Sequence, residues 1–303
     1  MSGVGRRLLS RRAALAAVAS AGMLGVTRVA RAVDPVATRS SAAPPILFVS
    51  HGSPRLAIDA ARYTPLRAWG ARLAKPRGIL VMTPHFASRR LLLGSTARGV
   101  AMYNLPGALK RLLPPGLDYP TPPSTGLAAE VESLLRGAHD VTRVTDRPGF
   151  DHTTWIPLHH LFPDADVPVL EIGFPYARDA DLFALGKRLA PLREQGIVFM
   201  ASGGITHNLA SVDFTFAAGR PVPAWSRDFD AWTAESLDAH AIDALVDWRT
   251  KAPGAELAHP DDGAHFRVLL VGLGVASASA TPRVRYPITG YESSMSARCI
   301  EMT

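Results

Sequence analysis

The apolar residues of this chain fall into short, nearly continuous runs, separated by longer stretches of mixed character. Runs this short and this apolar are typical of strands buried on both faces of a parallel sheet. The predicted strands cover 46–50, 78–83, 140–145, 167–174 and 196–201. Their alternation with helical stretches predicts an α/β fold, a single domain with a central, largely parallel β-sheet flanked by helices.

The stretches between the predicted strands have the spacing of amphipathic helices. Helices are predicted over 65–73, 128–135, 179–195, 225–239 and 241–250. The run 265–274 is apolar throughout, so its pattern fits either a helix or a strand. The last stretch, 284–302, is expected to form two paired strands around Gly290.

The first 32 residues have the pattern of an export signal. They contain two arginine pairs, Arg6-Arg7 and Arg11-Arg12, followed by an apolar stretch and by Ala30-Arg31-Ala32, a small-x-small cleavage site. The run around Arg11-Arg12 resembles a twin-arginine signal, which implies the twin-arginine export machinery as a partner and a periplasmic location. The apolar stretch 13–26 is shorter than the roughly 20 residues needed to span a bilayer, so no stable membrane insertion is expected once the signal is cleaved.

Composition then bounds what the rest of the chain can be. We expect a signal peptide over 1–32, a linker over 33–44 and one catalytic domain over 45–303. The formal charge of +7 comes mostly from the signal, because removing its six arginines from 33 basic residues leaves 27 against 26 acidic ones. A near-neutral mature chain gives no reason to expect nucleic-acid binding. The single cysteine, Cys299, excludes an intrachain disulfide and a thiolate metal cluster.

Histidines stand where several of the apolar runs begin or end. His51 follows the run 46–50, His85 follows 78–84, and His265 directly precedes 266–275. Imidazole is the commonest protein ligand for a catalytic transition metal, and chemistry in open α/β sheets gathers at strand ends. Each of these histidines alone could equally pack in the core or cap a helix, but together they predict a metal site built from distant segments.

Two further histidines lie in segments that suit a substrate pocket. His207 and Asn208 come after two adjacent glycines that follow the predicted strand 196–201, where backbone can approach a ligand closely. They could supply a base and a hydrogen-bond donor. His152 lies in Gly-Phe-Asp-His-Thr-Thr-Trp, where its neighbour Asp151 would point away from the imidazole if the segment were extended. By local pattern the surface histidines are predicted to be His139, His240 and His259.

Taken in order, these segments resemble the class III extradiol ring-cleavage dioxygenases, and within them the 4,5-DOPA dioxygenase group. The similar pieces are Phe-Val-Ser-His-Gly-Ser-Pro at 48–54, Thr-Pro-His-Phe at 83–86, the segments 149–155, 162–168 and 201–209, His265, and 290–296. The resemblance spans about residues 45–303, and the export signal is a departure from it, because members of this group are expected to be cytoplasmic.

The resemblance implies one divalent metal, Fe(II) for turnover or Zn(II) as bound, and a small aromatic diol and O₂ as substrates. His51, His85 and His265 would be metal ligands. His207 would be either a fourth ligand or the base that deprotonates the catechol. His152 would hydrogen-bond the bound oxygen or the substrate and act as an acid–base group. Asn208 is expected to be a substrate contact.

Two other interpretations stay open at the level of sequence. A tetrapyrrole metal chelatase also uses a His-Gly-Ser at a strand end near its N-terminus, and a periplasmic zinc-binding protein would use the same ligands without catalysis. Neither needs His152 or the Gly-Gly-x-x-His-Asn segment. The chain contains no phosphate-binding GxxxxGK[ST], no HExxH and no GxSxG, so the commonest nucleotide-binding, zinc-protease and α/β-hydrolase classes are not indicated.

Overall fold

The central feature of the fold is a mixed β-sheet. The computed structural model describes residues 43–94, 99–102, 111, 113, 117–215, 221–279 and 281–303, so the predicted signal peptide and nearly all of the linker lie outside the described residues. In the described part, eight strands pair in the order β4-β3-β5-β2-β6-β1-β10-β7. They are β1 (Ile46–Ser50), β2 (Gly78–Ser88), β3 (Leu91–Gly94), β4 (Val141–Val144), β5 (Val169–Pro175), β6 (Ile197–Gly203), β7 (Val284–Ile288) and β10 (Cys299–Met302).

The middle of this sheet is parallel and its edges are mixed. β5, β2, β6 and β1 run parallel to one another, whereas β3 pairs antiparallel with β5, and β10 pairs antiparallel with both β1 and β7. The carboxyl ends of the central parallel strands therefore meet at one edge, where functional groups of α/β sheets gather. The prediction of a largely parallel central sheet is confirmed.

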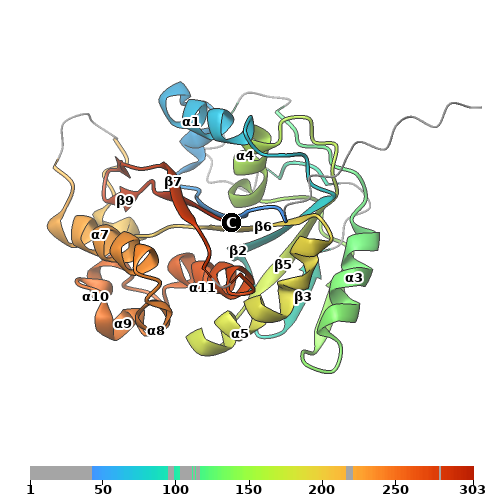
Figure 1. Cartoon of the computed structure of the whole chain (residues 1–303). Coiled ribbons are helices and arrows are strands. Elements are labelled where there is room, and N and C mark those ends of the chain that lie inside the picture. Colours follow the sequence, from blue (N-terminus) through green and yellow to red (C-terminus); the bar gives the residue numbers. More distant parts are fainter. Residues whose placement is uncertain are drawn as a thin grey trace, which may run out of the picture. The chain divides into compact units, whose positions relative to one another are not determined.

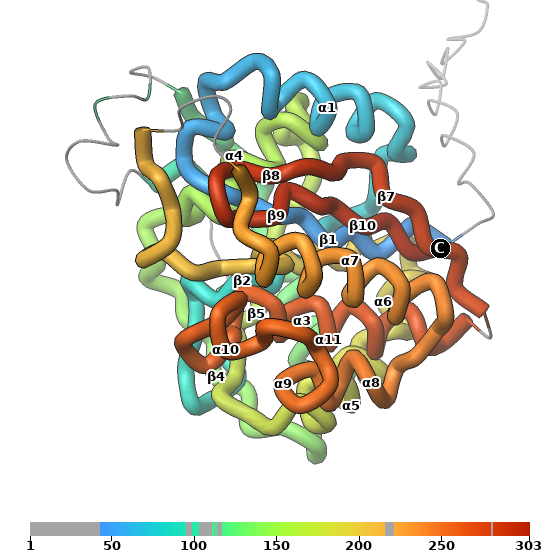
Figure 2. The backbone as a smooth tube through the Cα atoms, turned by 90° about the vertical axis from the view of Figure 1, so that its left-hand side faces the viewer, coloured from blue at the N-terminus to red at the C-terminus, as the bar shows by residue number. Residues whose placement is uncertain are grey.

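Helices cover both faces of the sheet, as Figure 1 shows. α1 and α4 lie on one face, and α3, α5 and α11 lie on the other (Figures 1 and 2). The helices are α1 (Ala60–Gly70), α3 (Thr125–Leu135), α4 (His152–Leu161), α5 (Asp179–Leu189), α6 (Pro191–Glu194), α7 (Ala224–Asp238), α8 (Ile242–Val246), α9 (Trp248–Lys251), α10 (Ala255–Ala258) and α11 (Ala264–Ala276), with 3₁₀ turns η1 (Pro54–Ala57) and η2 (Leu209–Ser211). None of the helices among the described residues is long and apolar enough to cross a bilayer.

The continuous apolar strands are explained by burial on both sides. In β1, Ile46 and Phe48 join the core beneath α5 and α11, whereas Leu47 and Val49 join the core beneath α1 and α4. All four side chains are fully buried. Because successive strand residues point to opposite faces, a strand covered by helices on both sides needs apolar residues at every position.

Several predicted elements differ from the structure; the predicted helix 241–250, for example, is two helices, α8 and α9. The predicted helix 179–195 is two helices, because Pro191 begins a new one after Leu189. The stretch 284–302 does contain paired strands, β7 and β10, but a small hairpin of β8 (Tyr291–Glu292) and β9 (Met295–Ser296) lies between them. The ambiguous run after His265 is a helix, α11.

The sequence pattern could not identify α11 as a helix rather than a strand, because this helix is buried on nearly all sides. All of its residues except Arg267 are buried, so the polar face that marks an amphipathic helix is missing. Its start is fixed by Gly263, whose φ of 72° ends the preceding loop in a left-handed conformation. Asp262 then accepts a hydrogen bond from the amide of Ala264 at 3.0 Å, which satisfies one free N–H of the first turn.

Candidate metal centre

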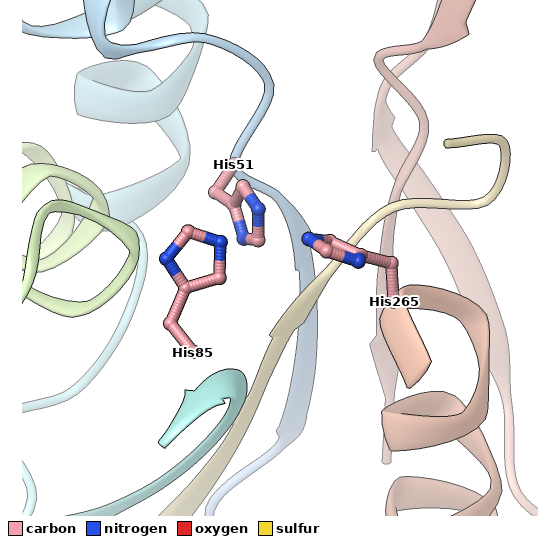
Figure 3. Close-up of side chains that lie close together, drawn as sticks. All are labelled: His51, His85 and His265. Atoms are coloured by element: carbon pink, nitrogen blue, oxygen red, sulfur yellow. The ribbon is translucent and has the colours of Figure 1, made fainter. Parts of the chain in front are cut away.

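Three of the predicted ligands converge at the carboxyl edge of the sheet. His51 follows β1, His85 lies in the irregular end of β2 between Thr83 and Ala87, and His265 lies in the first turn of α11. Figure 3 shows the three rings turned toward one another. Ring centroids are 5.6 Å apart for His51 and His85, 5.3 Å for His51 and His265, and 5.6 Å for His85 and His265.

Gly203 and Gly204, the glycine pair that follows the predicted strand, hydrogen-bond to the backbone of His51 and His265. The amide of His51 donates to the carbonyl of Gly203 at 3.1 Å, and the amide of Gly204 donates to the carbonyl of His265 at 3.0 Å. A Cβ at Gly203 would lie 2.1 Å from that same carbonyl oxygen, so glycine is required for the approach of α11 to β6. Gly203 therefore allows α11, the helix that carries His265, to pack closely against β6, and its role is not contact with a substrate.

His51 is oriented by a buried hydroxyl. Its Nδ1 lies 3.1 Å from Oγ of Ser202, and that hydroxyl donates to the carbonyl of Thr153 at 2.5 Å. Because the hydroxyl proton is used by Thr153, Oγ accepts from Nδ1–H of His51. The proton on Nδ1 leaves the lone pair on Nε2 free for a metal.

His85 is oriented by a carboxylate. Nδ1 of His85 lies 3.1 Å from Oδ2 of Asp151, while Oδ1 of Asp151 accepts from both the amide (2.8 Å) and the hydroxyl (2.5 Å) of Thr153. Asp151 is also the N-cap of α4. Burial alone would raise the pKa of Asp151, but its contacts with His152 and His85 outweigh burial and hold the pKa well below its ordinary value.

The donor set fits a divalent metal. A nitrogen from each of His51, His85 and His265 lies within 4.8 Å of the others. Nε2 of His265 is buried and has no hydrogen-bond partner among the described residues, an arrangement that a metal ion would satisfy. Burial lowers the pKa of His51 and of His265 well below 6.5, so both rings are neutral, as ligands must be. His85 keeps 31% of its side chain exposed, which leaves one side of the centre open.

His152 lies beside the three converging rings. It is the first residue of α4, its ring centroid is 5.0 Å from that of His85, and its Nδ1 lies 3.3 Å from Oδ2 of Asp151. Asp151 would point away from His152 only if the segment were extended, and the segment instead turns into a helix at this residue, which brings the two side chains together.

His207 and Asn208 meet the centre differently. The ring of His207 stacks on that of His265, with centroids 3.4 Å apart and an angle of 8°. Burial lowers the pKa of His207, so this ring is neutral near pH 7. Asn208 donates to the carbonyl of Leu257 at 2.8 Å, and its Oδ1 is buried without a partner among the described residues.

One histidine predicted at the surface is instead fully buried. His259 packs against Phe229, Trp248 and Phe266, and its Nε2 donates to the carbonyl of Ile205 at 2.8 Å. Burial lowers its pKa to about 4. His259 thus connects the loop that carries His207 to the segment before α11. No local sequence pattern around His259 predicts this role.

A buried ion pair supports the start of α4. Glu171 in β5 accepts from the hydroxyl of Thr154 at 2.7 Å and lies 2.8 Å from a guanidinium nitrogen of Arg147. Burial raises the pKa of Glu171 to about 7 even though Arg147 opposes the shift. A glutamate in the middle of an apolar strand was the signal that could have indicated this group.

Comparison with known proteins agrees with this geometry. Residues 39–296 match the family model described as the catalytic LigB subunit of aromatic ring-opening dioxygenase. The 4,5-DOPA dioxygenase extradiol of Beta vulgaris is 31% identical over 239 residues, covering 77% of this chain and 87% of that protein. The protein of the same description from Escherichia coli K12 is 29% identical over 263 residues, covering 84% and 92%.

A solved structure has a similar fold. The crystal structure of an uncharacterized protein from Escherichia coli K12 superposes with a TM-score of 0.69 at 26% identity, covering 86% of this chain and all of the other. The comparisons therefore extend over the described sheet and its helices rather than over the histidine segments alone.

Proposed function

Because the chain belongs to the LigB family of catalytic subunits of aromatic ring-opening dioxygenases, we propose that it opens the ring of a catechol by extradiol cleavage. In this reaction the carbon–carbon bond beside the diol breaks and both atoms of O₂ enter the product. The convergence of His51, His85 and His265 at the carboxyl edge of the sheet is the observation that carries the proposal. The chelatase and zinc-storage interpretations have no support from the family match.

LigB-family dioxygenases use a single divalent metal, and we assign its binding to these three imidazoles. We propose Fe(II) as the metal of turnover, because Zn(II) has no redox chemistry and cleavage by O₂ needs electron transfer. When bound, the metal supplies a Lewis acid for the catechol oxygens and a path for electrons to O₂. The exposed side of His85 is the side from which substrates would reach the centre.

The stacked geometry of His207 supports the role of base over that of fourth ligand. The ring of His207 stacks face to face on that of His265, and His207 is not among the three imidazoles, His51, His85 and His265, whose nitrogens converge. A neutral imidazole held at the rim of the site is suited to accept a catechol proton.

His152 is suited to hydrogen-bond the substrate and to exchange a proton with it. Its Nδ1 lies 3.3 Å from Oδ2 of Asp151, so the carboxylate can hold the ring in place beside the centre. Asp151 thus serves His85 and His152 together. For Asn208, which the sequence suggested as a substrate contact, the supported role is to hold the loop through its hydrogen bond to the carbonyl of Leu257.

The test is O₂ uptake by protein loaded anaerobically with Fe(II) and then given catechols, with absorbance followed for a ring-opened product. We expect uptake equal to product formed, lost in His51→Ala and strongly reduced in His152→Ala. His240→Asn is the matched control, since His240 is exposed and its φ of 53° is one that asparagine tolerates. Iron-loaded protein that consumes no O₂ with any catechol would refute the proposal.

We further propose that residues 1–32 direct export through the twin-arginine machinery, so that the mature chain works in the periplasm. The arginine pairs, the apolar stretch and the small-x-small site support this. Cell fractionation tests it: the chain should reach the periplasm, and Arg11→Lys with Arg12→Lys should retain it in the cytoplasm. Equal distribution of both forms would contradict export by this route.

A further inference from the structure

A buried hydroxyl attaches the loop that carries His207 to a distant part of the chain. Thr206 is 1% exposed, and its Oγ1 accepts from the amide of Ser296 at 2.8 Å and donates to the carbonyl of Ser294 at 3.1 Å. Both partners belong to the hairpin of β8 and β9, which follows 85 to 90 residues later in the sequence. The residue directly before His207 is therefore fixed by its side chain as well as by its backbone.

Two further hydrogen bonds strengthen this attachment. The hydroxyl of Ser226, in α7, donates to the carbonyl of Ser294 at 2.8 Å, so α7 and the loop share one acceptor on the hairpin. Beyond the histidine, the amide of Asp213 donates to Oγ of Ser293 at 2.7 Å. The tip of the hairpin therefore contacts the chain on both sides of His207.

The same hairpin is fixed beside His51. Glu292, in β8, is 5% exposed and accepts from the amide (3.0 Å) and the hydroxyl (2.6 Å) of Ser53, two residues after His51. In Figure 2 the hairpin lies between α1 and α7. One short element thus contacts both the turn that follows a proposed metal ligand and the loop that carries the proposed base.

We propose that Thr206 is a positioning residue for His207, whose imidazole it holds where the ring can accept the catechol proton. This inference rests on the proposed function for the role of His207. Stacking on His265 fixes the plane of the ring, but stacked rings can slide over one another, so the loop backbone must set the place of the ring along that plane. A misplacement of about 1 Å can cost about 100-fold in rate.

The main test removes only the hydroxyl. Thr206→Val keeps the shape of the side chain but leaves the buried amide of Ser296 without this acceptor. In the iron-loaded protein, kcat for catechol should fall by about 10- to 100-fold, while KM and metal affinity change by less than about 2-fold, because the three converging histidines are untouched. Thr206→Ser keeps the hydroxyl and should bring kcat back to within about 3-fold of the wild type.

Thr233→Val is the matched control. Thr233 is fully buried in α7, and its hydroxyl donates to the carbonyl of Phe229 at 2.8 Å, so the same substitution removes a buried hydrogen bond within one helix. It should leave kcat unchanged. An equal loss of kcat in the two valine variants would overturn the assignment, because it would reflect a general loss of stability. A loss of metal affinity in Thr206→Val large enough to explain its loss of kcat would overturn it as well.

Hydrogen exchange of the metal-free protein separates this inference from the proposed function. In Thr206→Val, peptides from 204–215 should exchange faster than in the wild type, whereas peptides from 46–50 should not. If no catechol is cleaved, the proposed function fails, while faster exchange still supports the attachment of the loop by Thr206. Unchanged exchange in 204–215 would refute that attachment.

Ser293→Gly tests the same attachment if Thr206→Val fails to fold. Ser293 has a φ of 57°, which glycine adopts freely, so the substitution removes the acceptor of the Asp213 amide without straining the backbone. A smaller loss of kcat is expected, with faster exchange in 204–215 and wild-type metal affinity. Wild-type kcat together with wild-type exchange would count against the hairpin as the element that holds His207.

Discussion

Gly203 offers a direct test of how the centre is assembled, because it is the point at which β6 touches the helix that carries His265. In Gly203→Ala the new Cβ would lie 2.1 Å from the carbonyl oxygen of His265 and 2.6 Å from Cγ2 of Val268. The first of these atoms belongs to the backbone, so no side-chain rotation relieves the contact. The strand and α11 must move apart.

The size of the effect follows from these distances. An ordinary contact begins near 3.4 Å, so the carbonyl of His265 must retreat by about 1.3 Å. Overpacking of this kind costs about 1–3 kcal/mol of stability. Metal–ligand distances tolerate only about 0.2 Å, so the same movement takes the imidazole out of bonding range. We expect the affinity for a divalent metal to fall by about 100-fold.

Gly204→Ala is the matched control one residue away. Its Cβ would approach nothing closer than the carbonyl oxygen of Thr206 at 3.4 Å, so it should keep metal affinity and change stability by less than about 1 kcal/mol. The assay is competition for the metal against a chelator of known affinity, together with chemical unfolding of both variants. Wild-type metal affinity in Gly203→Ala would refute the claim that this contact positions His265.

Three further outcomes are expected from the groups around the centre. Ser202→Ala removes the acceptor for Nδ1 of His51 and should weaken metal binding about 10- to 100-fold by chelator competition; unchanged affinity would mean that the ring is held otherwise. Glu171→Leu leaves Arg147 unpaired and should lower the unfolding free energy by about 3–5 kcal/mol. Glu171→Gln keeps an acceptor and should lower the unfolding free energy by less, so equal losses in the two variants would contradict a role for the ion pair. Burial lowers the pKa of His160 to about 4, so unfolding free energy on the order of 3 kcal/mol should be lost as pH falls from about 6.5 to 4, because the unfolded chain takes up the proton first. In His160→Gln the urea midpoint should depend less steeply on pH over this range. A pH dependence as steep as that of the wild type would refute the claim that His160 causes it.

The strands and the positions of His51 and His85 at the edge of the sheet were predictable because their signals are local. The runs ending at Ser50 and Thr83 are apolar at every position, and that pattern arises from burial on both faces of a sheet. His51 follows directly and His85 comes after one further residue, and the parallel strands of one sheet end at the same edge, here with β6 between β1 and β2. Position in the chain was therefore enough to place both histidines at one site.

The groups that orient the ligands were not predictable in the same way. Asp151 contacts His85 across 66 residues, and it does so only because α4 begins at the next residue. His259 is buried by aromatic side chains that come from α7, α9 and α11. These contacts depend on how helices pack on the sheet, which no hydrophobic period within one segment encodes.

The network under the centre shows why its ligands act as a unit. Thr153 is fully buried in the first turn of α4, and its carbonyl accepts from the Ser202 hydroxyl that orients His51. Its own hydroxyl and amide donate to Asp151, which orients His85. One residue thus couples the orientation of two ligands from different strands, while the backbone of β6 fixes the third. A small shift of α4 would turn two imidazoles together, so the packing of this helix governs the geometry of the candidate centre as much as the histidines themselves.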